Sequence, residues 1–424
     1  MSESVSKRNE NRPGYKKTNV GWIPEEWECQ TLRRVAYQPL VNGLFKRPNE
    51  YGSGTLLVNV IDTFGGLIID PTNLGRVRTS LNEVERYSNQ HGDLFFVRSS
   101  LKLEGVGNCG VLLDDQAQSV FECHLIRFRP DLDKADPLFL SYLCRSLSVR
   151  KQMLAFAQTT TMTTLPQSCL ERCLLLIPPL PEQKKIAEIL SAWDEAIEQM
   201  RELVNAKKGR KRALMQQLLT GKRRSRNYDS AHWQIRALQD LLEPVSRPVP
   251  KPQKPYLSIG IRSHGRGTFQ RIIEQPEKVM MDTLYRVESK DLIANITFAW
   301  EGAIAIASQR DSGGLVSHRF PTYRIREKEA DIDFIRNLIL TKRFVWDLGL
   351  ISPGGAGRNR VLNQKDFLKL QAFVPSVEAQ EEIGKILTEA DNELRLCEDY
   401  LNALVKQKRG LMQKLLTGEV RVKT

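Results

Sequence analysis

A long internal repeat constrains the fold of this chain more than any other feature of its sequence. Residues 178–221 align with residues 375–418 at a constant offset of 197 without a gap, and 17 of the 44 paired positions are identical. The strongest block reads Leu-Met-Gln-x-Leu-Leu-Thr-Gly, at positions 214–221 and again at 411–418. A repeat of this kind indicates one structural unit used twice. We therefore predict two related halves.

Weaker echoes of the repeat occur upstream, in the same order in both halves. The paired landmarks are Trp27, Leu32 and Val35 with Trp233, Leu238 and Leu241; Gly92-Asp93-Leu94 with Lys290-Asp291-Leu292; and Leu165 and Leu170 with Leu362 and Phe367. Chance similarity could produce one such echo, but not a series of them in a fixed order. The chain is therefore a tandem duplication whose ends match and whose middles have diverged.

Each half ends in a segment with the pattern of a long helix. Apolar and aliphatic positions alternate in steps of four and three from Ile186 to Leu218 and from Ile383 to Leu415, which is the seam of a coiled coil. Gly221 and Gly418 suit the C-terminal ends. About 34 residues at 1.5 Å per residue make each helix roughly 50 Å long. Packing of each helix on its own module alone is the alternative, less favoured because both helices share one register.

The charge distribution predicts how the two helices pair. Residues 182–202 carry six acids and three bases, whereas residues 207–226 carry nine bases and no acid. The second helix repeats this order, with eight acids and two bases over residues 378–399 and bases after them. This order of charges would also stabilise each helix by itself, because acids near the N-terminus and bases near the C-terminus interact favourably with the helix dipole. Only antiparallel pairing, however, sets acid against base, and we expect that arrangement to be pseudo-two-fold symmetric.

The regions that precede the helices share one plan. Short apolar runs bounded by turn-rich segments indicate strands, followed by one amphipathic helix near Pro137–Ala157 or Ile332–Leu348, a polar loop at 158–167 or 352–363, and a closing strand. We predict an α+β fold: a tandem duplication of two α/β modules separated by two long antiparallel coiled-coil helices. The predicted segments are an N-terminal tail (1–19), a first module (20–177), a first helix (178–226), a second module (227–374), and a second helix with a tail (375–424).

Composition excludes several classes of protein. An apolar fraction of 41% is enough to form hydrophobic cores. The chain has 63 Lys and Arg residues against 50 Asp and Glu residues, and the resulting net charge of +13 favours a polyanionic partner. We see no secretion signal and no apolar run of the ~18 residues that span a membrane. Seven scattered cysteines are typical of reduced thiols, so we expect a cytoplasmic protein.

Motifs for catalysis and metal binding are missing. The five histidines form no zinc-protease motif, and there is no phosphate-binding loop or dinucleotide-binding turn. Cys169 and Cys173 lack a second ligand pair, so we expect buried thiols there and no metal site. We therefore predict no catalytic residues in this chain.

Basic and polar clusters in the loops have the chemistry of nucleic-acid contacts. Arginine can pair with guanine, glutamine or asparagine with adenine, and hydroxyls with phosphate. The candidate DNA-binding residues are Arg76, Arg78, Arg98, Ser99, Gln158, Thr160 and Thr161 in the first module, and Arg262, His264, Arg266, Arg358, Asn359 and Arg360 in the second. Solvated loop polarity is the simpler explanation for any one of them.

The sequence resembles the specificity (S) subunit family of type I restriction–modification systems over nearly its whole length. The resemblance depends on GYKKTNVGWIPEEWE at 14–28, GDLFFVRSS at 92–100, PPLPEQKKIAEIL at 178–190, IGIRSHGRGTF at 259–269, and the two helices that end in LLTG. It implies two target-recognition domains, each of which reads half of a bipartite, asymmetric double-stranded DNA site. The helices would set the half-site spacing and dock two modification (methyltransferase) subunits.

The resemblance also implies where the chemistry of the complex resides. Adenine methylation with S-adenosylmethionine, and ATP- and Mg-dependent translocation and cleavage, would belong to the modification and restriction subunits, with no cofactor bound by this chain. The second helix begins PSVEAQEEI, a departure from the proline–PEQ signature that puts partner contacts there in doubt. The expected partner-binding residues are Pro178, Pro181, Gln183, Ile186, Leu190, Gln380, Ile383 and Leu387.

Three other readings stay open from the sequence. The chain could serve a fused methylase–nuclease polypeptide or a methylation-only system, which the neighbouring reading frames would distinguish. It could be a stand-alone DNA-binding regulator, which should bind its site without partners. A hidden nuclease would cut DNA in a metal-dependent way.

Overall fold

The structure is a computed structural model that describes residues 9–114, 118–159, 162–221, 233–355 and 360–423. It divides into two compact units, one formed by residues 1–199 together with 401–424 and the other by residues 200–400. Both long helices cross the boundary between the units, so each unit contains one module and a half of each helix. Within the described residues, we find no helix that is long and apolar enough to cross a membrane.

The two long helices are α6 (Leu180–Leu218) and α11 (Val377–Leu415), each of 39 residues. Every position of the predicted seam is buried or partly buried in both helices, which confirms the four–three spacing. Gly221 and Gly418 follow the helix ends with φ values of +69° and +71°, a left-handed conformation that glycine adopts without strain. Ring side chains lie close to both glycines, Trp233 and Phe373 at Gly221 and Pro24 and Trp27 at Gly418.

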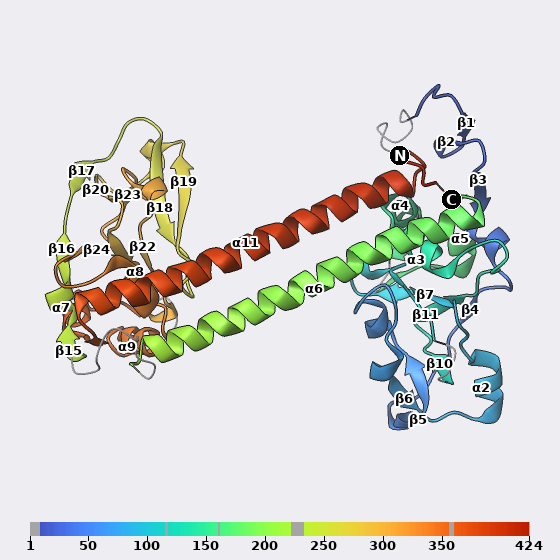
Figure 1. Cartoon of the computed structure of the whole chain (residues 1–424), viewed down its shortest axis with the longest axis horizontal. Coiled ribbons are helices and arrows are strands. Elements are labelled where there is room, and N and C mark those ends of the chain that lie inside the picture. Colours follow the sequence, from blue (N-terminus) through green and yellow to red (C-terminus); the bar gives the residue numbers. More distant parts are fainter. Residues whose placement is uncertain (1–8, 115–117, 160–161, 222–232, 356–359, 424) are drawn as a thin grey trace. The chain divides into compact units, whose positions relative to one another are not determined.

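The helices pair antiparallel, as their charges predict (Figure 1). In the first unit, Asp194 near the start of α6 forms an ion pair with Lys408 near the end of α11. In the second unit, the order reverses: Lys207 contacts Glu393 at 2.6 Å and Lys208 contacts Glu398 at 2.8 Å. Acid therefore meets base in both units.

The first module is built from short strands and helices. Its elements are β1 (Tyr15–Thr18), β2 (Gly21–Pro24), β3 (Glu28–Thr31), β4 (Val41–Asn42), β5 (Tyr51–Val58), β6 (Gly75–Val77), α2 (Leu81–Tyr87), β7 (Leu94–Val97), β8 (Ser99–Ser100), β9 (Cys109–Val111), β10 (Ser119–Phe121), β11 (Leu125–Phe128), α3 (Pro137–Arg145), α4 (Leu147–Phe156), β12 (Gln158–Thr159), β13 (Thr163–Thr164), α5 (Gln167–Glu171) and β14 (Leu174–Ile177). Residues 15–18 of the expected tail are thus a strand, and the Tyr15 hydroxyl donates to the Gly418 carbonyl.

The second module repeats much of this order. Its elements are β15 (Gln234–Ala237), α7 (Leu238–Leu241), β16 (Leu242–Val245), β17 (Pro248–Pro250), β18 (Tyr256–Ile261), β19 (Thr268–Ile273), β20 (Thr283–Arg286), β21 (Leu292–Ala294), β22 (Ile304–Ile306), β23 (Leu315–Val316), β24 (Thr322–Ile325), α8 (Ile332–Leu338), α9 (Lys342–Leu350), α10 (Gln364–Lys369) and β25 (Gln371–Val374).

The sheets show which parts of the two modules correspond. A four-stranded sheet has the order β4-β11-β7-β9 in the first module and β16-β24-β21-β22 in the second, and the pairs β14-β3 and β25-β15 also match. The second sheets differ, with three strands (β10-β5-β6) in one module and five (β17-β20-β23-β18-β19) in the other. We call the four-stranded sheet and the matching strand pair of each module its framework. The duplication is therefore preserved in the framework and lost in the second sheet.

Two expectations about the modules are corrected. The single amphipathic helix expected in each module is two helices, α3 with α4 and α8 with α9, because Ser146 and Thr341 adopt extended backbone and begin a new helix. The polar loop expected at 158–167 contributes strands β12 and β13 to a small sheet with β8.

A buried glutamine at the start of each long helix ties that helix to its module. Gln183 accepts a hydrogen bond from the Asp136 backbone N–H at 2.9 Å and donates to the carbonyls of Lys134 and Pro178. Gln380 repeats all three bonds with Asp331, Glu329 and Pro375. Asp136 and Asp331 in turn cap α3 and α8. The divergent second signature thus keeps the side chain that the junction needs.

These glutamines give a test of the duplicated junction. Replacing Gln183 with Ala should leave the Asp136 N–H and two carbonyls without partners and lower the free energy of local opening by about 1–3 kcal/mol. Gln380→Ala should do the same at Asp331. Hydrogen–deuterium exchange of the Asp136 and Asp331 amides measures the effect, with exposed Gln199→Ala on α6 as the control. Equal protection in all three variants would contradict this role.

Candidate nucleic-acid interface

The first module brings Arg76 and Arg78 to one surface hollow. The hollow has a volume of about 530 Å³ and is lined by Gly54, Thr55, Leu56, Arg76, Arg78, Thr79 and Gln118. The Arg76 guanidinium donates to the Gly54 carbonyl at 2.8 Å, and Arg78 Nε lies 3.2 Å from Ser53 Oγ. Both arginines are exposed. Guanidinium, hydroxyl and amide groups in one hollow suit contacts with phosphate and base edges.

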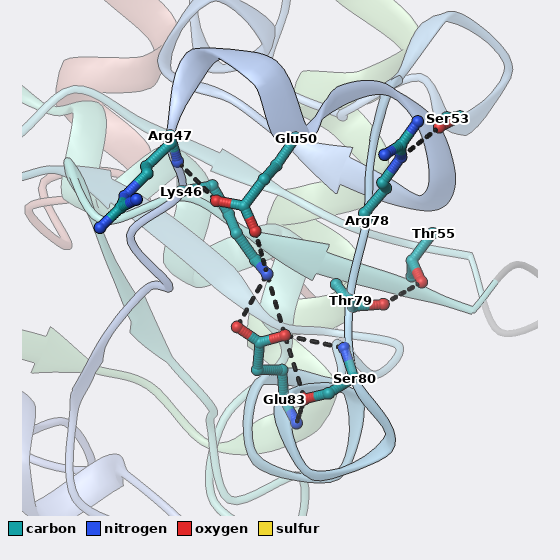
Figure 2. A network of polar contacts seen from close by, with 9 residues as sticks. All are labelled: Lys46, Arg47, Glu50, Ser53, Thr55, Arg78, Thr79, Ser80 and Glu83. Atoms are coloured by element: carbon teal, nitrogen blue, oxygen red, sulfur yellow. Dashed lines mark hydrogen bonds and ion pairs between the residues drawn. The ribbon is translucent and has the colours of Figure 1, made fainter.

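An ion-pair network holds the loops around this hollow (Figure 2). Lys46 lies between Glu50 and Glu83, with its Nζ 3.0 Å from a carboxylate oxygen of each. The hydrogen bond from Lys46 to Glu83 raises the pKa of the Lys46 ammonium. Backbone N–H groups of Arg47 and Ser80 lower the pKa of the Glu50 and Glu83 carboxyls, respectively. Only 9% of the Lys46 side chain is exposed, so the network fixes the loops, whereas Arg76 and Arg78 are exposed cations that line the hollow.

Arg98, Ser99 and Gln158 gather around the small sheet of β12, β13 and β8. Ser99 pairs with Thr164 on β13, and Gln158 pairs with the same residue from β12. Ser99 Oγ lies 2.7 Å from His124 Nδ1, and both residues line a second, mainly apolar hollow of about 600 Å³ that also includes Phe64 and Leu101. Thr160 and Thr161 lie outside the described residues.

One group of possible metal ligands occurs in the described part of the chain, formed by Glu122, Cys123 and His124. Its groups already have partners, because the His124 N–H donates to Glu122 Oε2 and His124 Nδ1 contacts Ser99. Burial raises the pKa of the Cys123 thiol, which disfavours the thiolate that binds metals. The thiols of Cys169 and Cys173 are buried and free, and Cys173 Sγ donates to the Cys169 carbonyl.

In the second module, Arg262, His264 and Arg266 lie on the turn between β18 and β19, and all three are exposed. His264 has a φ of +63°, and its N–H donates to the Glu301 carbonyl at 2.7 Å. The neighbouring Gly265 N–H donates to the Gly302 carbonyl. These bonds fix the turn against the short helix at 299–301, so the three basic side chains are held on a rigid support.

Arg360 makes contacts within its own module. Its guanidinium donates to the carbonyls of Gly349 (2.7 Å) and Ser352 (3.1 Å) and stacks over the Trp300 ring at 4.9 Å. These contacts close the end of α9 and give Arg360 a structural role, and its contact with DNA stays a prediction. Arg358 and Asn359 lie outside the described residues.

Most of the expected partner-binding residues belong to the core of this chain. Burial inside the units leaves Gln183, Ile186, Leu190, Gln380, Ile383 and Leu387 at most 4% exposed. Pro178 is also buried, whereas Pro181 is exposed. We therefore assign the buried residues to the helix–module junctions, because a partner cannot reach them.

Several residues of the sites have no separate signal in the sequence. Thr55, Thr79 and Gln118 line the first hollow, yet they come from three distant segments.

Glu182 is 2% exposed and accepts hydrogen bonds from Trp27 Nε1 and from Arg421. Arg421 also contacts Glu26 at 2.6 Å. Glu182 belongs to the sequence motif at 178–190, but nothing in that motif identifies Arg421 as its partner.

The chain is similar to proteins of known class. Residues 70–206 match the family model described as the type I restriction modification DNA specificity domain. The chain is 24% identical to a putative specificity subunit of the type I restriction enzyme MjaX from Methanocaldococcus jannaschii, over 97% of both chains. It is 31% identical to the specificity subunit of the type I restriction enzyme EcoKI from Escherichia coli, over 42% of this chain and 41% of that one.

A solved structure supports the fold. The S subunit of a type I restriction–modification system from M. genitalium superimposes with a TM-score of 0.54 at 15% identity, covering 95% of this chain and 98% of that one. The two structures therefore share one fold. The chain is thus similar over nearly its whole length to a specificity subunit of a type I restriction enzyme, and residues 70–206 match the DNA specificity domain.

The contacts of Arg360 predict a structural effect that an exposed arginine should not have. Arg360→Ala should lower the free energy of unfolding by about 1–3 kcal/mol, because two carbonyls lose a charged donor. Arg266→Ala, in the exposed turn, should stay within about 0.5 kcal/mol of the parent. Urea unfolding followed by tryptophan fluorescence measures both variants. Equal stability of the two variants would contradict a structural role for Arg360.

Proposed function

We propose that each module reads one half of a bipartite, asymmetric DNA site. The observation that carries the proposal is the pair of modules with one framework and two different second sheets. A shared framework supplies the same support twice, and different exposed surfaces give each module its own base contacts. In the first module, the proposed contact surfaces are the hollow with Arg76 and Arg78 and the region of Arg98, Ser99 and Gln158. In the second module, the proposed surface is the turn with Arg262, His264 and Arg266. Thr160, Thr161, Arg358 and Asn359 are proposed as DNA contacts from the sequence alone.

We propose that α6 and α11 set the distance between half-sites and carry the partner subunits. Both helices cross the boundary between the units, so their length connects the two modules. Exposed apolar side chains on the helices, Leu203 (41%), Leu396 (60%) and Tyr400 (55%), are better candidates for partner contact than the buried seam. In this proposal the chain recognises DNA without catalysis. S-adenosylmethionine, ATP and Mg bind the modification and restriction subunits of the complex, in the cytoplasm.

Exchange of one module tests the division of labour. Replacing residues 20–177 with the corresponding module of another specificity subunit should change one half of the methylated site and leave the other half and the spacer intact. Sequencing of methylated bases in cells that carry the chimera and its partner subunits determines both half-sites and the spacer length. The reciprocal exchange of residues 227–374 is the matched control. A change in both halves from either exchange would contradict independent modules.

Paired insertions test the spacing role. Seven residues inserted after Gln199 and seven after Tyr400 add one heptad to both helices and keep the seam in register within each unit. At about 1.5 Å per residue the addition is roughly 10 Å, or about three base pairs at ~3.4 Å each. The methylated site should keep both half-sites and gain a longer spacer.

The control for this experiment is the same insertion in α6 alone. It should shift α6 by one heptad against α11, break pairs such as Lys207–Glu393, and reduce assembly of the complex. A functional double insertion with an unchanged spacer would show that another element sets the gap.

A further inference from the structure

The hairpin β18–β19 presents an exposed edge strand in the second module. Strand β19 forms the edge of the five-stranded sheet, and four of its six residues, from Phe269 to Ile272, are exposed. Residues 256–273 contain three arginines and no acidic residue. A two-stranded ribbon has the dimensions that enter the major groove of DNA, and this ribbon also has the required charge.

A buried carboxylate lies beneath this edge strand. Asp311 is 0% exposed and accepts hydrogen bonds from the Ser308 N–H and hydroxyl (2.8 Å each) and from the Thr268 hydroxyl (2.8 Å). Its fourth bond comes from Gln270 Nε2 on β19, at 2.9 Å to Oδ1. Burial would raise the pKa of Asp311, but these hydrogen bonds outweigh burial and lower it. The group is therefore an ionised carboxylate that only accepts.

This carboxylate fixes the orientation of an exposed amide. Because ionised Asp311 has no proton to donate, Gln270 must turn its NH₂ group toward Asp311 and its carbonyl oxygen away. The amide NH₂ has a second N–H, so one donor and one acceptor remain available on an exposed side chain. A paired donor and acceptor on glutamine is the arrangement that recognises adenine through N7 and N6 in the major groove.

We propose that Gln270 reads an adenine in the half-site of the second module and that Asp311 is the positioning residue that orients it. The inference rests on the proposed function of the module as a DNA reader. It adds a specificity-determining residue on β19 to the basic turn with Arg262, His264 and Arg266. The turn supplies positive charge, and Gln270 supplies base discrimination.

Selection from a randomised duplex DNA library, with the full chain assembled with its modification subunits, tests this proposal. Gln270→Ala should reduce the preference for adenine at one position of one half-site by about 5- to 150-fold, the range of one bidentate base contact. All other positions should be unchanged. Gln275→Ala, an exposed glutamine just beyond β19, is the matched control and should bind as the parent does.

Three further variants separate orientation from folding. Asp311→Asn presents an NH₂ group as well as a carbonyl, so Gln270 is no longer held in one orientation and the same adenine preference should weaken. The double variant Gln270→Ala/Asp311→Asn should lose no more at that position than Gln270→Ala alone. If Asp311→Asn fails to fold, Gln270→Glu provides the second test, because a carboxylate cannot donate to N7 and should lose the adenine preference.

The outcomes distinguish this inference from the proposed function. If the parent complex selects a bipartite site and Gln270→Ala keeps every base preference, Gln270 is not a reader and the module function stands. A uniform loss of affinity with a weaker salt dependence would identify a phosphate contact and overturn the adenine assignment, as would loss of preference for another base. If the parent selects no bipartite site, both the proposed function and this inference fail.

Discussion

The antiparallel contact between α6 and α11 is the constraint on which the rest of the structure depends. The first unit is discontinuous in sequence, since residues 401–424 complete a body that begins with residues 1–199. Leu415 at the end of α11 and Leu416 directly after it belong to the same core as Trp27, Ile186 and Leu190. Only a helix that returns antiparallel brings these segments together, and the charge order in both helices favours that direction through pairs such as Asp194–Lys408 and Lys207–Glu393. Exposed ion pairs contribute little stability each, so their role is to select direction, while the apolar seam supplies the stability.

The junctions between helix and module explain why the repeat is uneven. Gln183 and Gln380 make the same three hydrogen bonds, so this position cannot change without leaving buried groups unpaired. The preceding position is free to differ. Glu182 is needed in the first unit because it binds Trp27 and Arg421, whereas Ala379 stands at the corresponding place in the second. The departure of the second signature is therefore a change of one local network and leaves the junction intact.

The sequence predicted the features that depend on regular spacing, and it failed where side chains from distant segments meet. The seam, the antiparallel direction and most apolar strands were predictable because their periodicity is local. The break at Ser146 was not, since the apolar pattern of 137–156 continues through it and only the extended backbone of that residue shows the break. Strand β19 was missed because its exposed residues lack an alternating pattern. Arg360 resembled a DNA contact in a basic loop, yet the carbonyls at the end of α9 hold it.

The position of Gln270 and Asp311 suggests how such a chain can change its target without losing its fold. Asp311, Thr268 and Ser308 lie in the second sheet and its loops, where the two modules differ most. The framework sheet β16-β24-β21-β22 contributes to a separate core with Leu218, Ile383 and Leu387 from the long helices. A substitution at Gln270 would therefore change the proposed base contact without touching that core, and Asp311 would keep its three other donors, the Ser308 N–H and the hydroxyls of Ser308 and Thr268. Substitutions at Asp311 are different, since they unpair a buried charge network. Under the proposed role of Gln270, specificity would vary at that residue while Asp311 stays constrained.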